Sequence, residues 1–162
     1  MKTIRNLPVL FFVAAVLFLA PQTRACFGTQ LKIAVEPGGP RALAAYAVGF
    51  FIAEKTGIEP DFIETPDAGE ALAKGRADLA LVDEKSASFM GVETREVGPV
   101  PGMGRARILL RTEILDDLRF TTVDRTLKLL PPFFSSRAYG GAAADSKTEP
   151  KKAAKKAVMD AT

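Results

Sequence analysis

The residues best suited to binding chemistry follow three apolar runs of the chain, at the points where strands would end. They are Glu36, Gly38, Gly39, Thr65, Asp83 and Glu84. Adjacent glycines let a backbone approach a ligand closely, and a helix beginning after them would offer N–H donors to an anionic group. The pattern predicts a small-ligand site with a preference for anions. Each residue also has a plainer interpretation, because such loops turn the chain, threonines cap helices and acids after strands are commonly solvated.

Groups typical of catalysis are scarce in this sequence. The chain has no histidine and one cysteine, which excludes Ser-His, Cys-His and His-zinc arrangements. The paired acids Asp83-Glu84 and Asp116-Asp117 could do acid–base work, but adjacent side chains point apart in a strand or a helix. We therefore expect no enzymatic activity and no cofactor or metal. Two tyrosines and no tryptophan also disfavour an aromatic cage for a quaternary amine.

A strand and a capped helix are predicted to position the first candidates. The apolar run 32–35 predicts a buried strand, and Pro40 suits the first position of a helix, where no N–H partner is needed. Apolar residues then recur one turn apart, which leaves Arg41 and Lys55 on the outer face. Gly57 fits a left-handed cap at the end of this helix.

The pattern repeats from Asp61 onward. A strand over 61–65 precedes a short helix, for which either Asp67 with Glu70 or Thr65 before Pro66 could supply the N-cap. This helix is expected to stop at Gly75. The run 77–82 that follows is nearly all apolar, which is typical of a parallel strand buried on both faces.

The remaining chain predicts fewer elements. Residues 105–111 indicate a fourth strand, and 122–130 indicate an amphipathic helix halted by Pro131-Pro132. Beyond Phe134 the sequence is rich in Gly, Ser, Ala and Lys, and it has little apolar area to offset chain entropy. We therefore expect residues 135–162 to form a flexible tail.

The first 25 residues have the character of a secretory signal peptide. Lys2 and Arg5 precede an apolar run over 7–20, and small residues follow at Thr23 and Ala25. The run is shorter than the ~20 residues that span a bilayer; an uncleaved anchor and an internal core helix are the alternatives. The predicted location is periplasmic or secreted. The net charge of +3 comes entirely from this segment, so the rest of the chain is neutral and nucleic-acid binding is not expected.

The single cysteine, Cys26, would be the first residue after cleavage. A lipoprotein is therefore an alternative, with membrane attachment through Cys26, although Arg24 fits poorly in the box of small residues that normally precedes a lipidated cysteine. Without a second cysteine, no disulfide can form within the chain.

The segment 31–84 resembles the opening half-lobe of the type 2 periplasmic solute-binding proteins. The resemblance rests on the order of strand, loop and helix and on a Leu-x-x-Gly-x-x-Asp-x-Ala motif, which stands here at Leu72 to Ala80. It implies an α/β fold, a single three-layer lobe with a mostly parallel sheet. Such proteins carry a second lobe of similar size after this unit, whereas only residues 85–103 separate the third strand here from the next candidate.

The predicted organisation is a signal peptide over 1–25, a single α/β solute-binding-like lobe over 26–134 and the tail over 135–162. The predicted function is an exported lobe that binds a small, anionic ligand as an accessory of an ABC-type transport system. The alternative is a structural or interaction protein of the cell envelope that has lost ligand binding, with an envelope protein as its partner. Paired catalytic carboxylates are the least favoured class.

Overall fold

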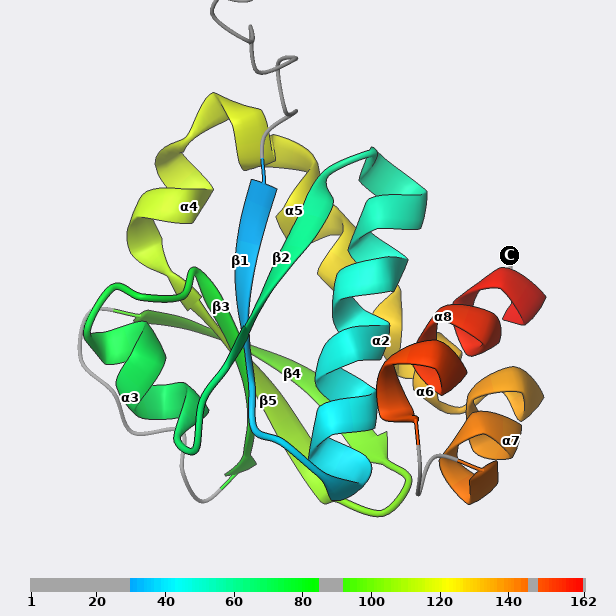
Figure 1. Ribbon diagram of the computed structural model, residues 1–162. Coiled ribbons are helices and arrows are strands. Elements are labelled where there is room, and N and C mark those ends of the chain that lie inside the picture. Colours follow the sequence, from blue (N-terminus) through cyan, green and yellow to red (C-terminus); the bar gives the residue numbers. More distant parts are fainter. Residues whose placement is uncertain (1–29, 85–91, 146–148, 162) are drawn as a thin grey trace, which may run out of the picture.

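A five-stranded sheet with helices on both faces organises the chain (Figure 1). The computed structural model describes residues 30–84, 92–145 and 149–161. The strands are β1 (Gln30–Val35), β2 (Glu59–Glu64), β3 (Leu79–Asp83), β4 (Val92–Val100) and β5 (Gly104–Arg111). The helices are α2 (Gly39–Thr56), α3 (Ala68–Ala73), α4 (Thr112–Asp116), α5 (Thr121–Leu127), α6 (Leu130–Phe134), α7 (Arg137–Asp145) and α8 (Pro150–Ala161), with a 3-10 turn, η2 (Leu118–Phe120). The α/β class predicted from the sequence is consistent with this architecture.

The sheet is mixed, in the order β2-β1-β3-β5-β4. β1 pairs in parallel with β2 and β3, whereas β5 pairs antiparallel with both β3 and β4. The prediction of a mostly parallel sheet is therefore not confirmed. The apolar run 105–111 was correctly predicted as a strand, but strand direction depends on the connection that precedes it. Here a tight turn after β4 returns the chain as a hairpin partner.

The sequence signals at the ends of α2 and α3 act as predicted. A proline stands in the first turn of α2, and Gly57 ends that helix in the left-handed conformation with φ 74°. Asp67 is the N-cap of α3, and its side chain accepts a hydrogen bond from the Glu70 amide at 2.8 Å. Of the two caps that competed in the sequence, the structure uses Asp67.

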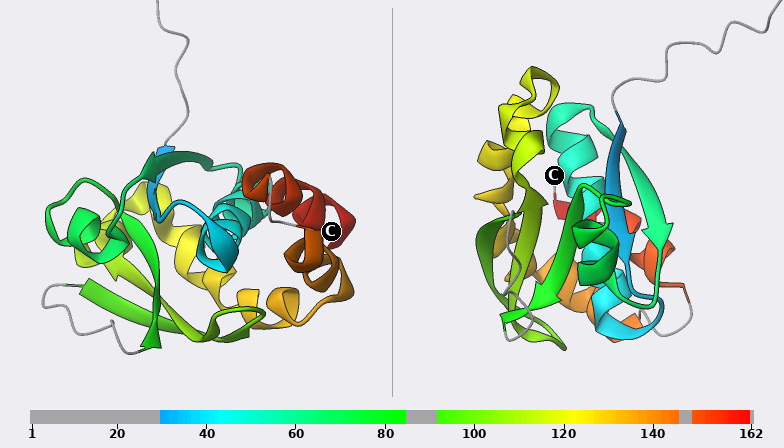
Figure 2. Two further views of the ribbon diagram at one scale, coloured as in Figure 1. Left: turned by 60° about the horizontal axis from the view of Figure 1, so that its bottom comes forward. Right: turned by 90° about the vertical axis from the view of Figure 1, so that its left-hand side faces the viewer.

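Helices α2 and α3 cover opposite faces of the sheet, as Figure 1 and the turned views of Figure 2 show. Ile33 and Val35 of β1 point toward the larger core, which includes α2, while Ala34 points toward the smaller core with α3. The alternation in β1 thus places apolar side chains on both faces. This explains the continuous hydrophobic run in the sequence.

Strand β4 was missed in the sequence analysis. Its residues VETREVGPV carry alternating charges, and most of them stay half-buried or exposed because β4 lies at the edge of the sheet. A register shift between Glu96 and Gly98 adds a bulge. Charge and bulges are common on edge strands, which they protect from pairing with other chains, so the hydrophobic pattern gave little sign of this strand.

The prediction of a flexible tail is wrong for the described part of residues 135–162. This part forms α7 and α8, and α8 packs against α2. Ala154, Ala157 and Val158 are each at most 2% exposed. The tail does bury apolar surface, because alanines on one side of α8 allow a close approach to α2. The prolines at 131 and 132 also differ from the prediction, since they open α6 rather than only ending the preceding helix.

The predicted signal peptide, its cleavage point and Cys26 lie outside the described residues. Within the described ranges, no helix is both long and apolar enough to span a bilayer.

Candidate functional site

The candidate site lies at the carboxyl ends of β1 and β3. β1 lies between β2 and β3 in the sheet, and the helices that follow β1 and β2 lie on opposite faces. The loops after the neighbouring strands β1 and β2 therefore separate at this edge, next to the end of β3. In open α/β sheets such a topological switch point forms a crevice at which ligands commonly bind.

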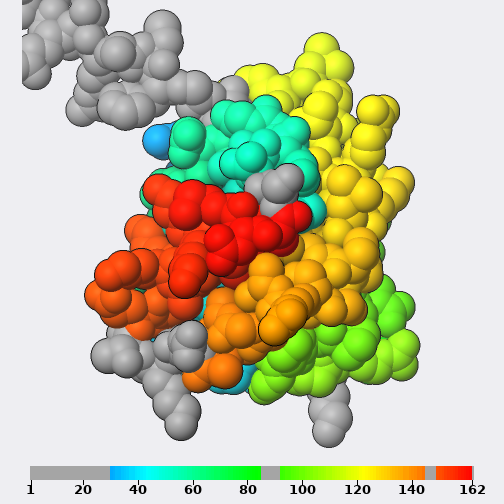
Figure 3. Space-filling view, turned by 90° about the vertical axis from the view of Figure 1, so that its right-hand side faces the viewer, coloured from blue at the N-terminus to red at the C-terminus, as the bar shows by residue number. Residues whose placement is uncertain are grey.

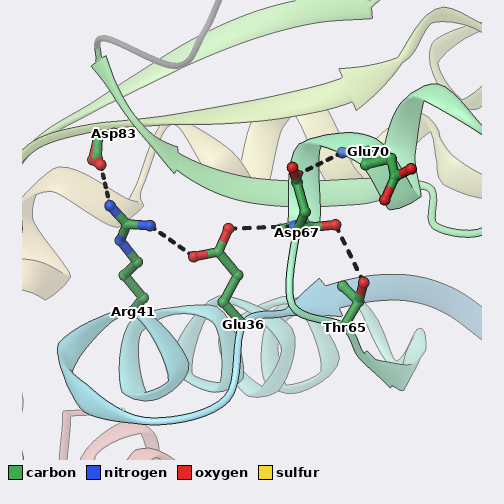
Figure 4. A network of polar contacts seen from close by, with 7 residues as sticks. Glu36, Arg41, Thr65, Asp67, Glu70 and Asp83 are labelled. Carbon is green, nitrogen blue, oxygen red and sulfur yellow. Dashed lines mark hydrogen bonds and ion pairs between the residues drawn. The ribbon is translucent and has the colours of Figure 1, made fainter.

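Arg41, in the first turn of α2, joins the ends of β1 and β3 (Figure 4). Its Nη1 donates a hydrogen bond to Glu36 Oε2 at 2.7 Å, and its Nη2 donates to Asp83 Oδ2. The hydrogen bond to Glu36, with the negative charges of Asp83 and Glu36, raises the pKa of the Arg41 guanidinium against a smaller opposing effect of burial. The hydrophobic pattern of α2 predicted Arg41 on the outer face of the helix. The partners of Arg41 were not predicted because helical periodicity says nothing about the strand ends that lie beside the first turn of the helix.

Glu36 also links this network to the start of α3. Its Oε1 accepts a hydrogen bond from the Ala68 amide at 3.3 Å, so one carboxylate contacts both α2 and α3. Thr65 is buried, and its hydroxyl donates to the Asp67 carbonyl at 3.2 Å. Thr65 therefore shapes the turn before α3 rather than presenting its hydroxyl to solvent.

These elements enclose an open pocket of about 420 Å³, a volume within the range of small-ligand sites. Its lining residues are Glu36, Arg41, Pro66, Asp67, Gly69, Val82 and Asp83. The lining contains three carboxylates and one guanidinium, and the guanidinium already has two of these carboxylates as partners. The local charge of the pocket is thus negative.

Of the six candidate residues, Glu36 and Asp83 meet in the pocket. Gly38 and Gly39 adopt positive φ of 89° and 65°, and a Cβ on either would meet nothing within 4 Å. Their positive φ turns the chain between β1 and α2, and neither glycine is in the pocket lining. Glu84 is not in the pocket lining and forms an ion pair with Arg107 at 3.3 Å.

Four further residues of the lining were not predicted from the sequence: Arg41, Pro66, Asp67 and Gly69. A signal for Arg41 was present, since a charged residue directly after Pro40 must lie beside the loop that ends β1. Asp67 was identified only as a cap. One of its oxygens performs that role, and the residue lines the pocket as well.

Members of both acid pairs contact arginines. Asp83 and Glu84 contact different arginines, and the hydrogen bonds from Arg119 lower the pKa of the half-buried Asp117 carboxyl. Within the described ranges, no group of three or more Asp, Glu, His or Cys residues is placed to hold a metal ion.

The motif that carries the family resemblance has a structural role. Asp78 Oδ2 accepts a hydrogen bond from the Lys32 amide at 2.9 Å, and its Oδ1 lies 3.9 Å from Arg111 Nη1. Asp78 thus ties the start of β3 to β1 and β5, while Gly75 turns the chain with φ 68°. Comparison with known proteins found no matching family model and no significant match among curated proteins or solved structures.

Proposed function

We propose that this chain is an exported solute-binding lobe whose ligand occupies the pocket at the ends of β1 and β3. The observation that supports the proposal most is the convergence of side chains from the carboxyl ends of three strands, β1, β2 and β3, at a topological switch point. The sequence resemblance to solute-binding proteins points to the same edge of the sheet. This resemblance implies that the chain acts as an accessory of a transport system.

The charges in the pocket favour a different ligand from the anion expected on sequence grounds. An anion would have to compete with Glu36 and Asp83 for Arg41, and Asp67 adds a third negative charge. A solute with an amine or several hydroxyl groups could instead donate hydrogen bonds to these carboxylates. The proposed ligand is therefore a small polar solute with donor groups.

Binding to the lobe alone should be weak. The pocket is open to solvent, so much of the ligand would stay in water, whereas good sites bury most of a ligand's surface. A partner or a second copy that covered the opening would strengthen binding.

The alternative is an envelope interaction protein, and one observation favours it. The guanidinium of Arg41 already forms ion pairs with Glu36 and Asp83. In this alternative the ion pairs hold α2 against the strand ends and have no part in ligand binding. In that case the pocket would be a by-product of the fold.

Export is a second part of the proposal, supported by the charged, apolar and small-residue segments before Cys26. Intact-mass measurement on protein recovered from its native host should give a chain that begins at Cys26. An added lipid mass would select the lipoprotein form. A chain that retains residues 1–25 would contradict cleavage.

The test of binding is a thermal-shift screen against amino acids, diamines, sugars and carboxylic acids. A ligand at about 100 times its Kd stabilises a protein by about 2.7 kcal/mol, which raises Tm by several degrees. Asp83→Asn should remove the shift caused by any active solute. The matched control is Glu84→Gln, a neighbouring change outside the pocket lining, which should leave the shift intact. A screen with no active solute, or a shift unaffected by Asp83→Asn, would favour the bracing role.

A further inference from the structure

A second concave surface lies on the other side of α2, where α8 meets β2 and α2. It is an open groove of about 620 Å³, called here the aromatic–lysine groove. Its lining residues are Tyr46, Phe50, Glu64, Glu149, Pro150, Lys151, Lys152 and Lys155. Figure 3 shows α8 in red at the surface, beside α2 and α7. In the left-hand view of Figure 2, α8 and α3 lie at opposite sides of the molecule, so the groove is separate from the pocket described above.

Aromatic rings form the floor of the groove. Phe62 of β2 contacts Tyr46 and Phe50 of α2 edge to face, with ring centroids 4.8 and 5.3 Å apart. The Tyr46 hydroxyl donates a hydrogen bond to Glu64 at 2.8 Å. Burial, together with this hydrogen bond, raises the pKa of Tyr46 to about 12, so the ring stays neutral and its hydroxyl stays engaged.

Ammonium groups of α8 surround this floor. Lys151 Nζ lies 5.2 Å from the centroid of the Phe62 ring, and Lys152 Nζ lies 3.2 Å from Glu149. Lys155 has no ion-pair partner within the described ranges. Glu64 and Glu149, the two acids of the lining, are thus already engaged, and the lysines outnumber them. An apolar floor with a positive rim is complementary to an apolar group that carries a negative charge.

The surroundings favour a small molecule over a peptide strand. β2 is an edge strand, but Pro60 lacks an N–H to donate, and Glu59 and Asp61 would repel an acidic strand. The groove is concave, and its volume lies in the range of small-ligand sites. A flat membrane surface would meet the outer lysines of α8 but would not fill the groove.

We propose that the aromatic–lysine groove binds a small aromatic anion. Its ring would lie against Phe50 and Pro150, and its carboxylate or sulfonate would lie near Lys152 and Lys155. This proposal does not depend on the solute pocket, since none of the groove residues lines that pocket.

The test uses anilinonaphthalene sulfonate as the aromatic anion and N-phenyl-naphthylamine as its uncharged analogue, both followed by fluorescence titration of the full chain. The wild-type protein should bind the sulfonate more tightly than the uncharged analogue. Lys155→Glu should raise the Kd for the sulfonate by about fivefold or more, because it replaces an attractive charge by a repulsive one. Lys155→Arg should keep the affinity.

Lys156→Glu is the matched control, since it makes the same change on the same helix outside the groove lining. It should change the Kd by less than twofold, and urea unfolding should show that both variants stay folded. Equal losses in the two variants would mean attraction to the general charge of α8, as for a membrane surface, and would overturn the proposal. Equal affinity for the two probes, or no binding of either, would also overturn it.

Discussion

Gly49 lies where α2 crosses the sheet, and the absence of a side chain there permits the close contact. A Cβ on this residue would come within 2.6 Å of Phe62 Cε1 and 2.9 Å of Ile33 Cδ1. Gly49→Ala should therefore lower the free energy of unfolding by about 1–3 kcal/mol, measured by urea denaturation.

Gly140→Ala is the control for this prediction. Gly140 lies in α7, where a Cβ would meet nothing within 4 Å. Alanine is favoured over glycine in helices, so this change should stabilise the protein by about 0.5–1 kcal/mol. If Gly49→Ala were also stabilising, α2 could not lie against the sheet as closely as described.

The Arg95–Asp124 ion pair, which joins β4 to α5, should give the stability a pH dependence. The hydrogen bond from Arg95 Nε at 2.6 Å is the main cause that lowers the pKa of the Asp124 carboxyl. A carboxyl whose pKa is lower in the folded state stabilises it above the unfolded pKa, and this contribution is lost as the pH falls through the folded pKa. Asp124→Asn should cost about 0.5–1 kcal/mol at pH 7.

Urea denaturation of both proteins as a function of pH is the measurement. The difference between wild type and Asp124→Asn should shrink as the pH falls below about 4, where the wild-type carboxyl also becomes neutral. A difference that stayed constant down to pH 2 would mean that the charge of Asp124 contributes nothing.

At the same scale, some site residues could be predicted and others could not. Glu36 and Asp83 were predicted because parallel strands bring their carboxyl ends to one edge of the sheet. Thr65 also lies at that edge, but its hydroxyl donates within its own turn. Arg41 was missed because the hydrophobic pattern of a helix identifies its buried face, and the polar partners of its first turn come from other segments.

For the elements, α8 provides the clearest test. Ala154 is 0% exposed and belongs to the core cluster that includes the buried residues of α2. Ala154→Gln should lower the free energy of unfolding by about 2 kcal/mol, because a longer polar side chain would be forced into this core. Lys156→Gln, on the exposed side of the same helix, should change it by less than about 0.5 kcal/mol. Equal small effects from both substitutions would support the flexible tail expected from composition.

The elements from β1 to β3 were predictable because prolines, glycines and caps mark their ends. β4 and α8 were not, for different reasons. β4 is a charged edge strand with little apolar periodicity, and α8 uses alanines, whose small buried area resembles that of a solvated segment. The reversed direction of β5 follows from its hairpin with β4, so the missed strand also concealed the mixed character of the sheet.

For the whole molecule, the sheet order determines where the candidate pocket lies. α2 and α3 follow the neighbouring strands β1 and β2 on opposite faces of the sheet, and the pocket lies between their first turns and the end of β3. The aromatic–lysine groove on the far side of α2 offers a surface of opposite charge, so the two sites should select different ligands.

The central claim, that a polar solute binds at the switch point, is tested most directly by NMR. Amide signals of the labelled protein would be followed during titration with a pool of amino acids, diamines and sugars. The shifts should cluster at Glu36, Asp67, Gly69 and Asp83, and signals near Gly140 should stay unchanged. If no pool member shifts the signals of these pocket residues, or if the shifts cluster elsewhere in the protein, the claim is contradicted.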